Sequence, residues 1–192
     1  MKKSFPSFIN TLRSITEISQ SQADKICSMA RRAELEKGEC FIRAGDIPEK
    51  LAFVTKGLFR YYYLNKKGDE FTKGFFLKNT FISSYSAMIQ DRASYFTIQA
   101  LEKSEIIVIR YLDWERLLQD HDCWTRVLLS FIEKGFCVKE AREREFLLFN
   151  AMERYTSFLE LFPGLEKRIK QHMIASYVGI TPVALSRIKK KM

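Results

Sequence analysis

The sequence predicts an α+β protein with an N-terminal antiparallel β jelly roll, a long helix and a C-terminal helix-turn-helix. Short aromatic and β-branched segments alternate with glycines from Gly38 to Gly68, which is typical of a small antiparallel barrel. A helical pattern then runs from Asp113 to about Phe149, and the last twenty-odd residues have the spacing of two crossing helices. We therefore expect a barrel over residues 1–112, a long helix over 113–149 and a helix-turn-helix domain over 150–192.

The composition is that of a globular protein, with 46% hydrophobic and 29% charged residues in a chain of 192. No apolar run approaches the roughly twenty residues that a membrane helix requires. The N-terminal residues contain no uninterrupted apolar segment and no small-residue cleavage site, so no signal peptide is predicted. We expect a cytoplasmic protein that does not bind a membrane.

The net charge of +9 favours a polyanionic partner, and its distribution is uneven. Residues 150–192 contain eight lysines and arginines but only three acidic residues, a net charge of +5 in less than a quarter of the chain. This concentration of positive charge points to double-stranded DNA more strongly than a uniformly basic surface would.

The cysteines and histidines do not have the arrangement of a metal site or an enzyme. No Cys-x-x-Cys pair occurs, so neither a metal nor another cofactor is expected, and scattered cysteines are mostly buried apolar residues. Neither histidine lies in the predicted barrel, and no glycine-rich phosphate loop is present, so we do not expect an enzyme. These residues are Cys27, Cys40, Cys123 and Cys137, and His121 and His172.

Secondary structure follows from hydrophobic periodicity and turn residues. Residues 4–37 are predicted to form one or two helices, with Ser21 and Asp24 resembling a cap ahead of Ile26. Strands are predicted at 39–44, 50–56, 58–64, 70–76, 95–101 and 105–110, with a hairpin loop over 65–68.

One face of the predicted long helix carries an apolar stripe. Such a stripe needs either a groove in its own domain or a second copy of the helix. Because a helix of this length extends past a small barrel, we expect a dimer seam, although packing on the barrel accounts for part of the stripe. The stripe consists of Trp124, Leu128, Phe131, Gly135 and Val138.

The C-terminal segment carries cap and turn signals of a helix-turn-helix. Asn150 and Glu153 form a capping pair that starts a helix over 151–162, so residue 150 is the expected hinge. Gly179 supplies the turn between two further helices, and Thr181-Pro182 starts the second one. Ala175, Leu185 and Ile188 complete the spacing. An ordinary αα-hairpin with a solvated basic end is the alternative.

Several short motifs occur in a specific order along the whole chain. They are Gly38-Glu39, Gly45-Asp46, Val54-Thr55-Lys56-Gly57, Phe81-Ile82, Ala100-Leu101-Glu102, Ser104-Glu105-Ile106, Glu153-Arg154-Tyr155 and the run from Ile174 to Thr181. This arrangement resembles the Crp/Fnr family of bacterial transcription regulators. The resemblance implies a homodimer that binds inverted-repeat DNA and has a cyclic-nucleotide-binding-like barrel as its sensor.

The chain departs from the family at the ligand site. Ser83-Ser84 aligns with the Gly-Glu pair that holds the ribose in cyclic-AMP-binding relatives, and Ser94-Tyr95 aligns with the Arg-Ser/Thr pair that holds the phosphate. Loss of a bidentate charged contact costs about 1.5–3 kcal/mol, so cyclic AMP is not the expected effector. Either an unidentified small molecule or no ligand fits the aromatic and hydroxyl side chains predicted here. These are Ser83, Ser84, Tyr85, Ser94, Tyr95, Tyr61 and Tyr63.

The second departure concerns base recognition. Many relatives read a cytosine and a guanine with a glutamate and an arginine, but Val183 stands at the glutamate position here. Arg187 can bind guanine O6 and N7, whereas Val183 can touch only a thymine methyl or another apolar edge. Ser186 and Arg187 are the predicted base readers. The other predicted DNA contacts are Lys170, Gln171, His172, Thr181, Lys189 and Lys190.

Two function classes follow from these features. The first is a homodimeric DNA-binding transcription regulator, re-set at the hinge near residue 150. The second is a ligand-binding barrel that acts through protein partners and has a merely structural C-terminal hairpin.

Overall fold

The computed structural model describes residues 5–192, which form two compact units. The barrel unit contains the chain up to Tyr61 and the segment Phe75–Glu133. The C-terminal unit contains Tyr62–Gly74 and Lys134–Met192. The C-terminal unit therefore includes a hairpin that belongs, in sequence, to the predicted barrel. The long helix is likewise divided between the two units.

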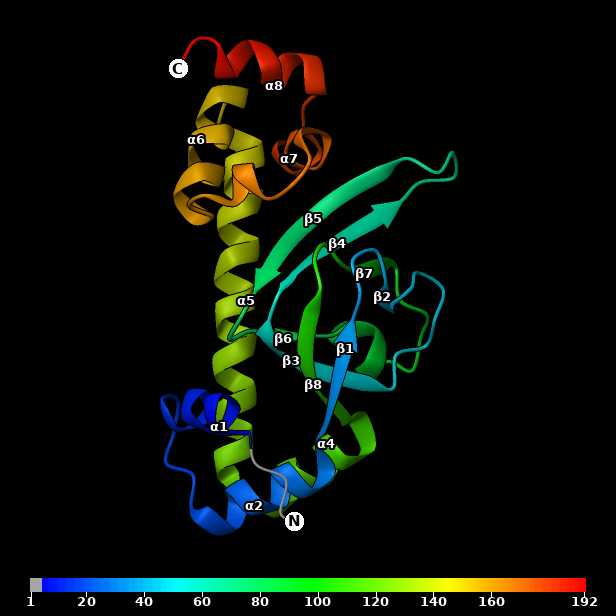
Figure 1. Cartoon of the computed structure of the whole chain (residues 1–192), viewed down its shortest axis with the longest axis vertical. Coiled ribbons are helices and arrows are strands. Elements are labelled where there is room, and N and C mark those ends of the chain that lie inside the picture. The colour runs from blue at the N-terminus through cyan, green and yellow to red at the C-terminus, as the bar shows by residue number, and fades with distance from the viewer. Residues whose placement is uncertain (1–4) are drawn as a thin grey trace. The chain divides into compact units, whose positions relative to one another are not determined.

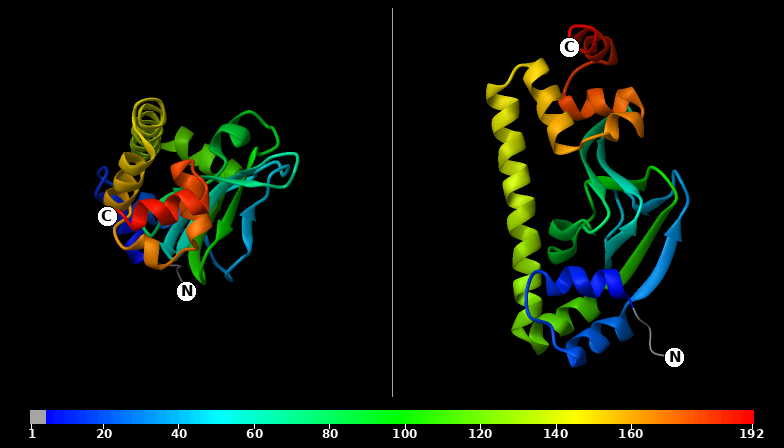
Figure 2. Two further views of the ribbon diagram at one scale, coloured as in Figure 1. Left: turned by 90° about the horizontal axis from the view of Figure 1, so that it is seen from above. Right: turned by 60° about the vertical axis from the view of Figure 1, so that its left-hand side comes forward.

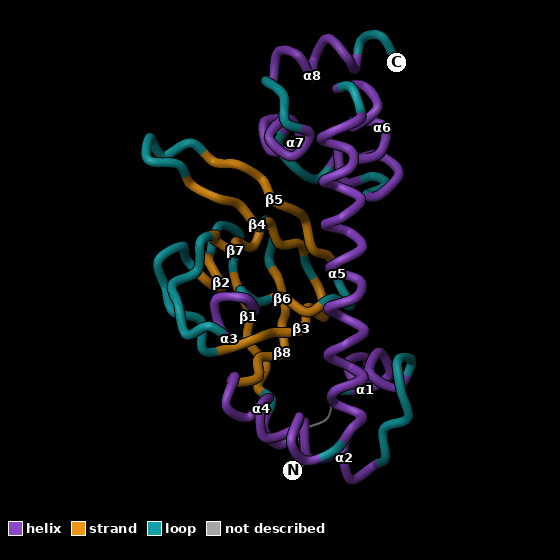
Figure 3. The backbone as a smooth tube through the Cα atoms, turned by 180° about the vertical axis from the view of Figure 1, so that it is seen from behind, coloured by secondary structure: helices purple, strands orange, loops and turns teal. Residues whose placement is uncertain are grey.

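The predicted antiparallel jelly roll is confirmed as two four-stranded sheets (Figure 1). The first sheet has the order β1 (Arg31–Leu35), β8 (Ser104–Arg110), β3 (Lys50–Lys56) and β6 (Phe81–Ile82). The second has the order β2 (Cys40–Ile42), β7 (Phe96–Ala100), β4 (Leu58–Leu64) and β5 (Glu70–Leu77). Figure 3 distinguishes these strands, in orange, from the helices, in purple. A buried cluster that includes Phe59, Ile98 and Ile106 forms the core of the barrel.

The prediction for residues 4–37 is wrong at its end. Two helices form, α1 (Pro6–Arg13) and α2 (Gln20–Met29), but residues 31–35 are strand β1. Ala33 pairs with Ile106 of β8, and Leu35 is buried in the barrel core, so tertiary pairing overrides the helical pattern. The cap of α2 is Ser19, whose hydroxyl accepts from the Gln22 N–H, and not Ser21. The short elements β6 and α3 (Tyr85–Ile89) were not predicted.

The predicted continuous helix over 113–149 is also wrong in one respect, because it is broken at His121. Helix α4 (Tyr111–Asp120) ends there and α5 (Asp122–Leu148) begins. His121 has extended backbone angles, with φ −161° and ψ 137°. Its ring Nδ1 accepts from the Cys123 N–H at 3.1 Å, which satisfies a donor at the start of α5.

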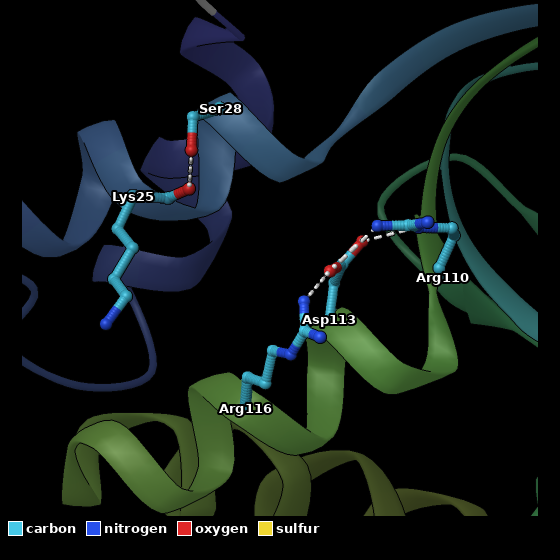
Figure 4. A network of polar contacts seen from close by, with 5 residues as sticks. All are labelled: Lys25, Ser28, Arg110, Asp113 and Arg116. Carbon is cyan, nitrogen blue, oxygen red and sulfur yellow. Dashed lines mark hydrogen bonds and ion pairs between the residues drawn. The ribbon is translucent and has the colours of Figure 1, made fainter.

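A carboxylate organises the turn from β8 into α4 (Figure 4). Asp113 is only 5% exposed and lies in the first turn of α4, where a negative charge is favoured. It accepts from Arg110 at 2.7 and 3.1 Å and from Arg116 at 3.2 Å. The contact with Asp113 raises the pKa of Arg110. Nearby, the Ser28 hydroxyl donates to the Lys25 carbonyl at 2.7 Å.

The C-terminal unit contains α6 (Ala151–Leu161), a short 3-10 helix (Leu165–Lys167), α7 (Gln171–Val178) and α8 (Pro182–Lys189), seen again in Figure 2. The predicted capping box is confirmed, since Asn150 accepts from the Glu153 N–H while the Glu153 carboxylate accepts from the Asn150 N–H. The core of this unit includes Tyr155, Phe158, Leu165, Ile174, Ala175, Tyr177, Val178 and Leu185. Within residues 5–192, no helix is long and apolar enough to span a bilayer.

Candidate nucleic-acid interface

The turn between α7 and α8 has the predicted geometry. Gly179 is left-handed, with φ 77°, and the Ile180 N–H donates to the Ala175 carbonyl at 3.0 Å. The Thr181 hydroxyl accepts from the Ala184 N–H at 3.2 Å and Pro182 occupies the first helical position. Leu185 of α8 and Ala175 of α7 are both fully buried, so apolar contacts hold α8 to the unit. The helix-turn-helix therefore exists as predicted.

The predicted DNA-contacting side chains are all exposed and lie on two elements. Lys170, Gln171 and His172 lie at the N-terminus of α7. The others lie along α8 or cap it, and Val183 among them is 62% exposed. This second group consists of Thr181, Val183, Ser186, Arg187, Lys189 and Lys190. Their exposure leaves them available to a partner, and their assignment as DNA contacts stays a prediction.

Positive charge is concentrated in the C-terminal unit. This unit contains 15 lysines and arginines against 8 acidic residues, so it carries +7 of the net charge of +9. Because phosphate neutralisation supplies most of the non-specific affinity for DNA, a unit with this charge is suited to bind a duplex.

Two arginines, Arg142 on α5 and Arg154 on α6, bind the C-terminal end of α7. Arg142 donates to the Tyr177 carbonyl at 2.7 Å, and Arg154 donates to the Val178 carbonyl at 2.8 Å. Both guanidinium groups face the Phe146 ring, at 4.7 and 5.2 Å from its centroid. Cations at the carbonyl end of a helix complement its dipole, so these contacts stabilise the C-terminus of α7.

The same ring approaches the helix-turn-helix turn closely. A Cβ added at Gly179 would lie 2.5 Å from Cε1 of Phe146. Gly179 is thus required both for its positive φ and for this approach. No sequence pattern predicts these contacts of Arg142, Phe146 and Arg154, because on α5 and α6 nothing in the spacing of these side chains separates them from a solvated face.

Two of the four aligned cyclic-nucleotide positions in the barrel are buried and hydrogen-bonded within the protein. Ser84 and Ser94 are 1% and 3% exposed, and their hydroxyl oxygens lie 2.9 Å apart. The Tyr61 hydroxyl accepts from the Ser83 N–H at 2.9 Å. The Tyr61 ring packs against Phe76 and Phe96, at centroid distances of 4.0 and 5.1 Å, and burial raises its pKa.

Of the seven predicted pocket residues, the exposure of Tyr95 requires a correction, and the rest of the pocket stays a prediction. Tyr95 is 76% exposed because its side chain leaves the core immediately before β7. Tyr63 belongs to the C-terminal unit, where Lys73 lies 5.8 Å from its ring. Tyr85 packs against the helical core of the barrel unit. Among these residues, hydrogen bonds join Tyr61 with Ser83 and Ser84 with Ser94.

A groove of about 350 Å³ lies elsewhere on the barrel unit. It is formed by β1, β2, β3, β8 and the turns beside them, and none of the seven predicted effector residues lines it. Its lining is Ala33, Glu34, Leu35, Glu39, Cys40, Phe41, Arg43, Lys50, Ile106 and Val108.

The predicted dimer stripe on α5 needs a correction as well. Trp124 is fully buried in the core of its own chain, where its Nε1 donates to Gln22, and Leu128 and Phe131 pack against the same core. For these three residues, packing within the chain therefore accounts for the stripe. Val138 is 51% exposed. A different face of α5 exposes Leu129, Ile132 and Phe136, each between 47% and 64% exposed.

The cysteines occupy different environments. Cys27 and Cys123 are buried, Cys40 is half-buried and Cys137 is exposed. Across residues 5–192, no cluster of three or more histidine, cysteine or acidic side chains has the arrangement of a metal site.

Comparison with known proteins identifies the barrel. Residues 32–121 match the family model of the cyclic nucleotide-binding domain. Comparison with curated proteins found no relative of this chain at the level of sequence.

Solved structures resemble nearly the whole chain. FixK2 from Bradyrhizobium japonicum is 17% identical, with 84% of this chain and 83% of that chain covered and a TM-score of 0.75. The c-di-GMP responsive global regulator CLP from Xanthomonas campestris is 16% identical, with 90% and 91% covered and a TM-score of 0.74. A protein from Eubacterium rectale assigned to the crp/fnr family is 18% identical, with 97% and 86% covered and a TM-score of 0.72. At these identities the likeness shows the fold.

Proposed function

We propose that the protein is a DNA-binding transcription regulator, because residues 32–121 match the cyclic nucleotide-binding domain family and the chain has the fold of the Crp/Fnr regulators. The observation that carries the proposal is the exposed face of α8 on a unit of net charge +7. The structural neighbours are regulators and not enzymes, which agrees with a non-catalytic role. A cytoplasmic location belongs to the same proposal.

In this proposal α8 enters the major groove. Arg187 binds guanine O6 and N7, Ser186 makes a second base contact, and Val183 accepts an apolar edge such as a thymine methyl. The lysines of α8 and the residues at the N-terminus of α7 bind phosphates and fix the register without reading sequence. The nine predicted side chains thus divide into a small reading group and a larger positioning group.

We propose a homodimer on an inverted repeat. Its seam uses Leu129, Ile132 and Phe136 in place of Trp124, because those three side chains are exposed on one face of α5 whereas Trp124 is buried in its own chain. Two copies of α8 would then contact half-sites about 34–36 Å apart. Exposed apolar side chains at helical spacing are a typical feature of such a seam.

The barrel acts in this proposal without cyclic AMP. Two of the aligned hydroxyl groups, those of Ser84 and Ser94, bond to each other, and Tyr61 packs against Phe76 and Phe96, which supports a sensor with another effector or with none.

The test is selection of bound DNA from a random pool, followed by affinity measurements on the selected site. Arg187→Ala should cost about 1–3 kcal/mol of binding free energy and relax one base position, whereas Lys190→Ala should weaken all sequences alike and flatten the salt dependence. Both side chains are exposed, so neither change should unfold the protein. Equal losses on the selected site and on random DNA for both variants would reject the assignment of Arg187.

The alternative function is a ligand-binding barrel that acts through protein partners. It predicts that the wild-type chain selects no sequence from the pool at physiological salt, with or without added cell extract. The hydrogen bond between Ser84 and Ser94 in the barrel and the exposed α8 both favour the DNA-binding proposal over this alternative.

A further inference from the structure

The outer part of the hairpin formed by β4 and β5 belongs to the same compact unit as the helix-turn-helix, and Figures 1 and 2 show it beside α7. Residues 62–74 precede the other segment of this unit, Lys134–Met192, by sixty or more positions in the sequence, yet the hairpin lies beside α7. The Ser176 hydroxyl accepts from the Thr72 N–H at 2.8 Å and donates to the Glu70 carbonyl at 3.0 Å. Arg142 donates to the Thr72 carbonyl at 3.3 Å and to the Tyr177 carbonyl at 2.7 Å. The hairpin is therefore fastened to α7 by one serine and one arginine.

The tip of the hairpin is a rigid basic loop. The Asn65 side-chain carbonyl accepts from the Lys67 and Asp69 N–H groups, both at 2.9 Å, and Gly68 supplies a φ of +85°. The Asn65 amide also donates to the Asp69 carboxylate at 2.9 Å. Lys66 and Lys67 are exposed, and within the described part of the chain neither has a carboxylate partner. The loop thus presents two unpaired positive charges on a defined backbone.

The docking point lies on the α7 face that is predicted to meet DNA. His172, a predicted phosphate contact, and Ser176 are four residues apart on α7, so they share one face of the helix at a rise of about 6 Å. Lys67 precedes Glu70, the first residue of β5, by three residues, so their Cα atoms are at most about 10 Å apart. A duplex held at the N-terminus of α7 has phosphates at this range, because B-DNA carries one negative charge per roughly 1.7 Å of its axis.

We propose that the β4–β5 hairpin is a second DNA-contacting element, in which Lys66 and Lys67 bind phosphates that flank the half-site read by α8. The inference rests on the proposed DNA-binding function. The hairpin then acts as a β-ribbon beside α8, and Ser176 and Arg142 hold it in place. The partner is the flanking backbone, so the contact adds affinity and salt dependence without adding sequence preference.

The test compares two duplexes that carry the operator selected from the random pool. One ends at the operator, and the other extends about 15 base pairs beyond it on each side, which is roughly one and a half turns. Wild-type protein should bind the longer duplex more tightly. Lys66→Gln/Lys67→Gln should remove this advantage, a loss of roughly tenfold, and should reduce the salt slope by about 0.9 for each lost contact on the longer duplex alone.

Two further variants make the comparison specific. Lys37→Gln/Lys78→Gln removes the same charge from exposed sites on the barrel unit and should leave both duplexes bound as by the wild type. Ser176→Ala removes the hydroxyl that fastens the hairpin and should lower the preference for the longer duplex without removing a charge. Denaturation midpoints verify that each variant is folded.

The outcomes separate the inference from the function on which it rests. Unchanged binding of the longer duplex by the hairpin variant would overturn the inference while the DNA-binding function stands. If that variant binds both duplexes normally but lowers transcription in a reconstituted reaction, the hairpin serves a protein partner and the inference is again rejected. Failure of the wild type to select any sequence would reject the proposed function itself.

Discussion

Short polar side chains occur both in the helix-turn-helix and at the aligned nucleotide site of the barrel, but their hydrogen bonds have opposite effects. In the helix-turn-helix, the hydroxyl of Thr181 caps a helix while the side chains of α8 remain exposed. In the barrel, Ser84 and Ser94 bond to each other and are buried. Internal hydrogen bonds leave one surface free for a partner and close the other site.

The difference shows that satisfied polar groups distinguish a closed site from an open one better than residue types do. A buried hydroxyl with a protein partner must lose that bond before it can bind a ligand, and leaving a buried polar group unsatisfied costs about 1–3 kcal/mol. The exposed residues of α8 lose only contacts with water. Ligand binding is therefore expected at α8 and opposed at the Ser84–Ser94 pair.

The largest effect is expected at the turn of the helix-turn-helix. Gly179→Ala introduces a Cβ at φ 77° and places it against the Phe146 ring. Left-handed strain of about 1–2 kcal/mol and overpacking of about 1–3 kcal/mol together predict a loss of roughly 2–5 kcal/mol in the free energy of unfolding of this unit. Chemical denaturation followed by a probe in the C-terminal unit measures the loss.

Gly164→Ala is the matched control for that substitution. Gly164 has nearly the same φ, 78°, but its added Cβ meets nothing within 4 Å. It should show only the backbone strain of about 1–2 kcal/mol. If the two alanine variants are equally destabilised, the close approach of Phe146 to Gly179 contributes nothing to the loss.

The sequence predicted local features of the helix-turn-helix and missed its distant supports. Asn150 with Glu153, and Thr181 with Pro182, are signals within four residues, so the starts of α6 and α8 could be placed correctly. Arg142 bonds to Tyr177 across 35 residues, and Ser176 bonds to Thr72 across 104. Contacts at such separations leave no periodic pattern in a single sequence.

The apolar stripe of α5 illustrates a second limit. Its spacing correctly predicted a helix whose one face is covered, but periodicity cannot identify what covers that face. The chain's own helices bury Trp124, and the exposed Leu129 lies on a different face. In the barrel, the alignment identified Ser84 and Ser94 but gave no sign that the two hydroxyl groups bond to each other.

A smaller effect is expected from the arginine that supports α7. Arg142 packs 3.9 Å from the Tyr177 ring centroid and 4.7 Å from that of Phe146, and burial lowers its pKa. Arg142→Met keeps the length of the side chain but removes the bonds to Tyr177 and Thr72, with an expected cost of about 2 kcal/mol. Denaturation of the purified variant measures it.

Arg144→Met provides the comparison for Arg142, since Arg144 is exposed on the same helix. It should change the free energy of unfolding by no more than about 0.5 kcal/mol. Similar losses in both variants would mean that charge on α5, and not the contacts of Arg142, supports the C-terminal unit.

The smallest effect is expected from cyclic AMP on the barrel. A ligand present at 100 times its Kd stabilises a protein by about 2.7 kcal/mol, which corresponds to roughly 5–10 °C in Tm for a chain of this size. The aligned site has Ser94 in place of the phosphate-binding arginine, and its hydroxyl is already engaged by Ser84 and Phe96. Millimolar cyclic AMP should therefore shift Tm by no more than AMP does at the same concentration. AMP carries the same base without the cyclic phosphate, so it controls for weak nucleotide binding elsewhere. A saturable rise in Tm that only the cyclic nucleotide produces would show that the serine pair opens. The aligned site would then be available to a ligand, as the exposed face of α8 is.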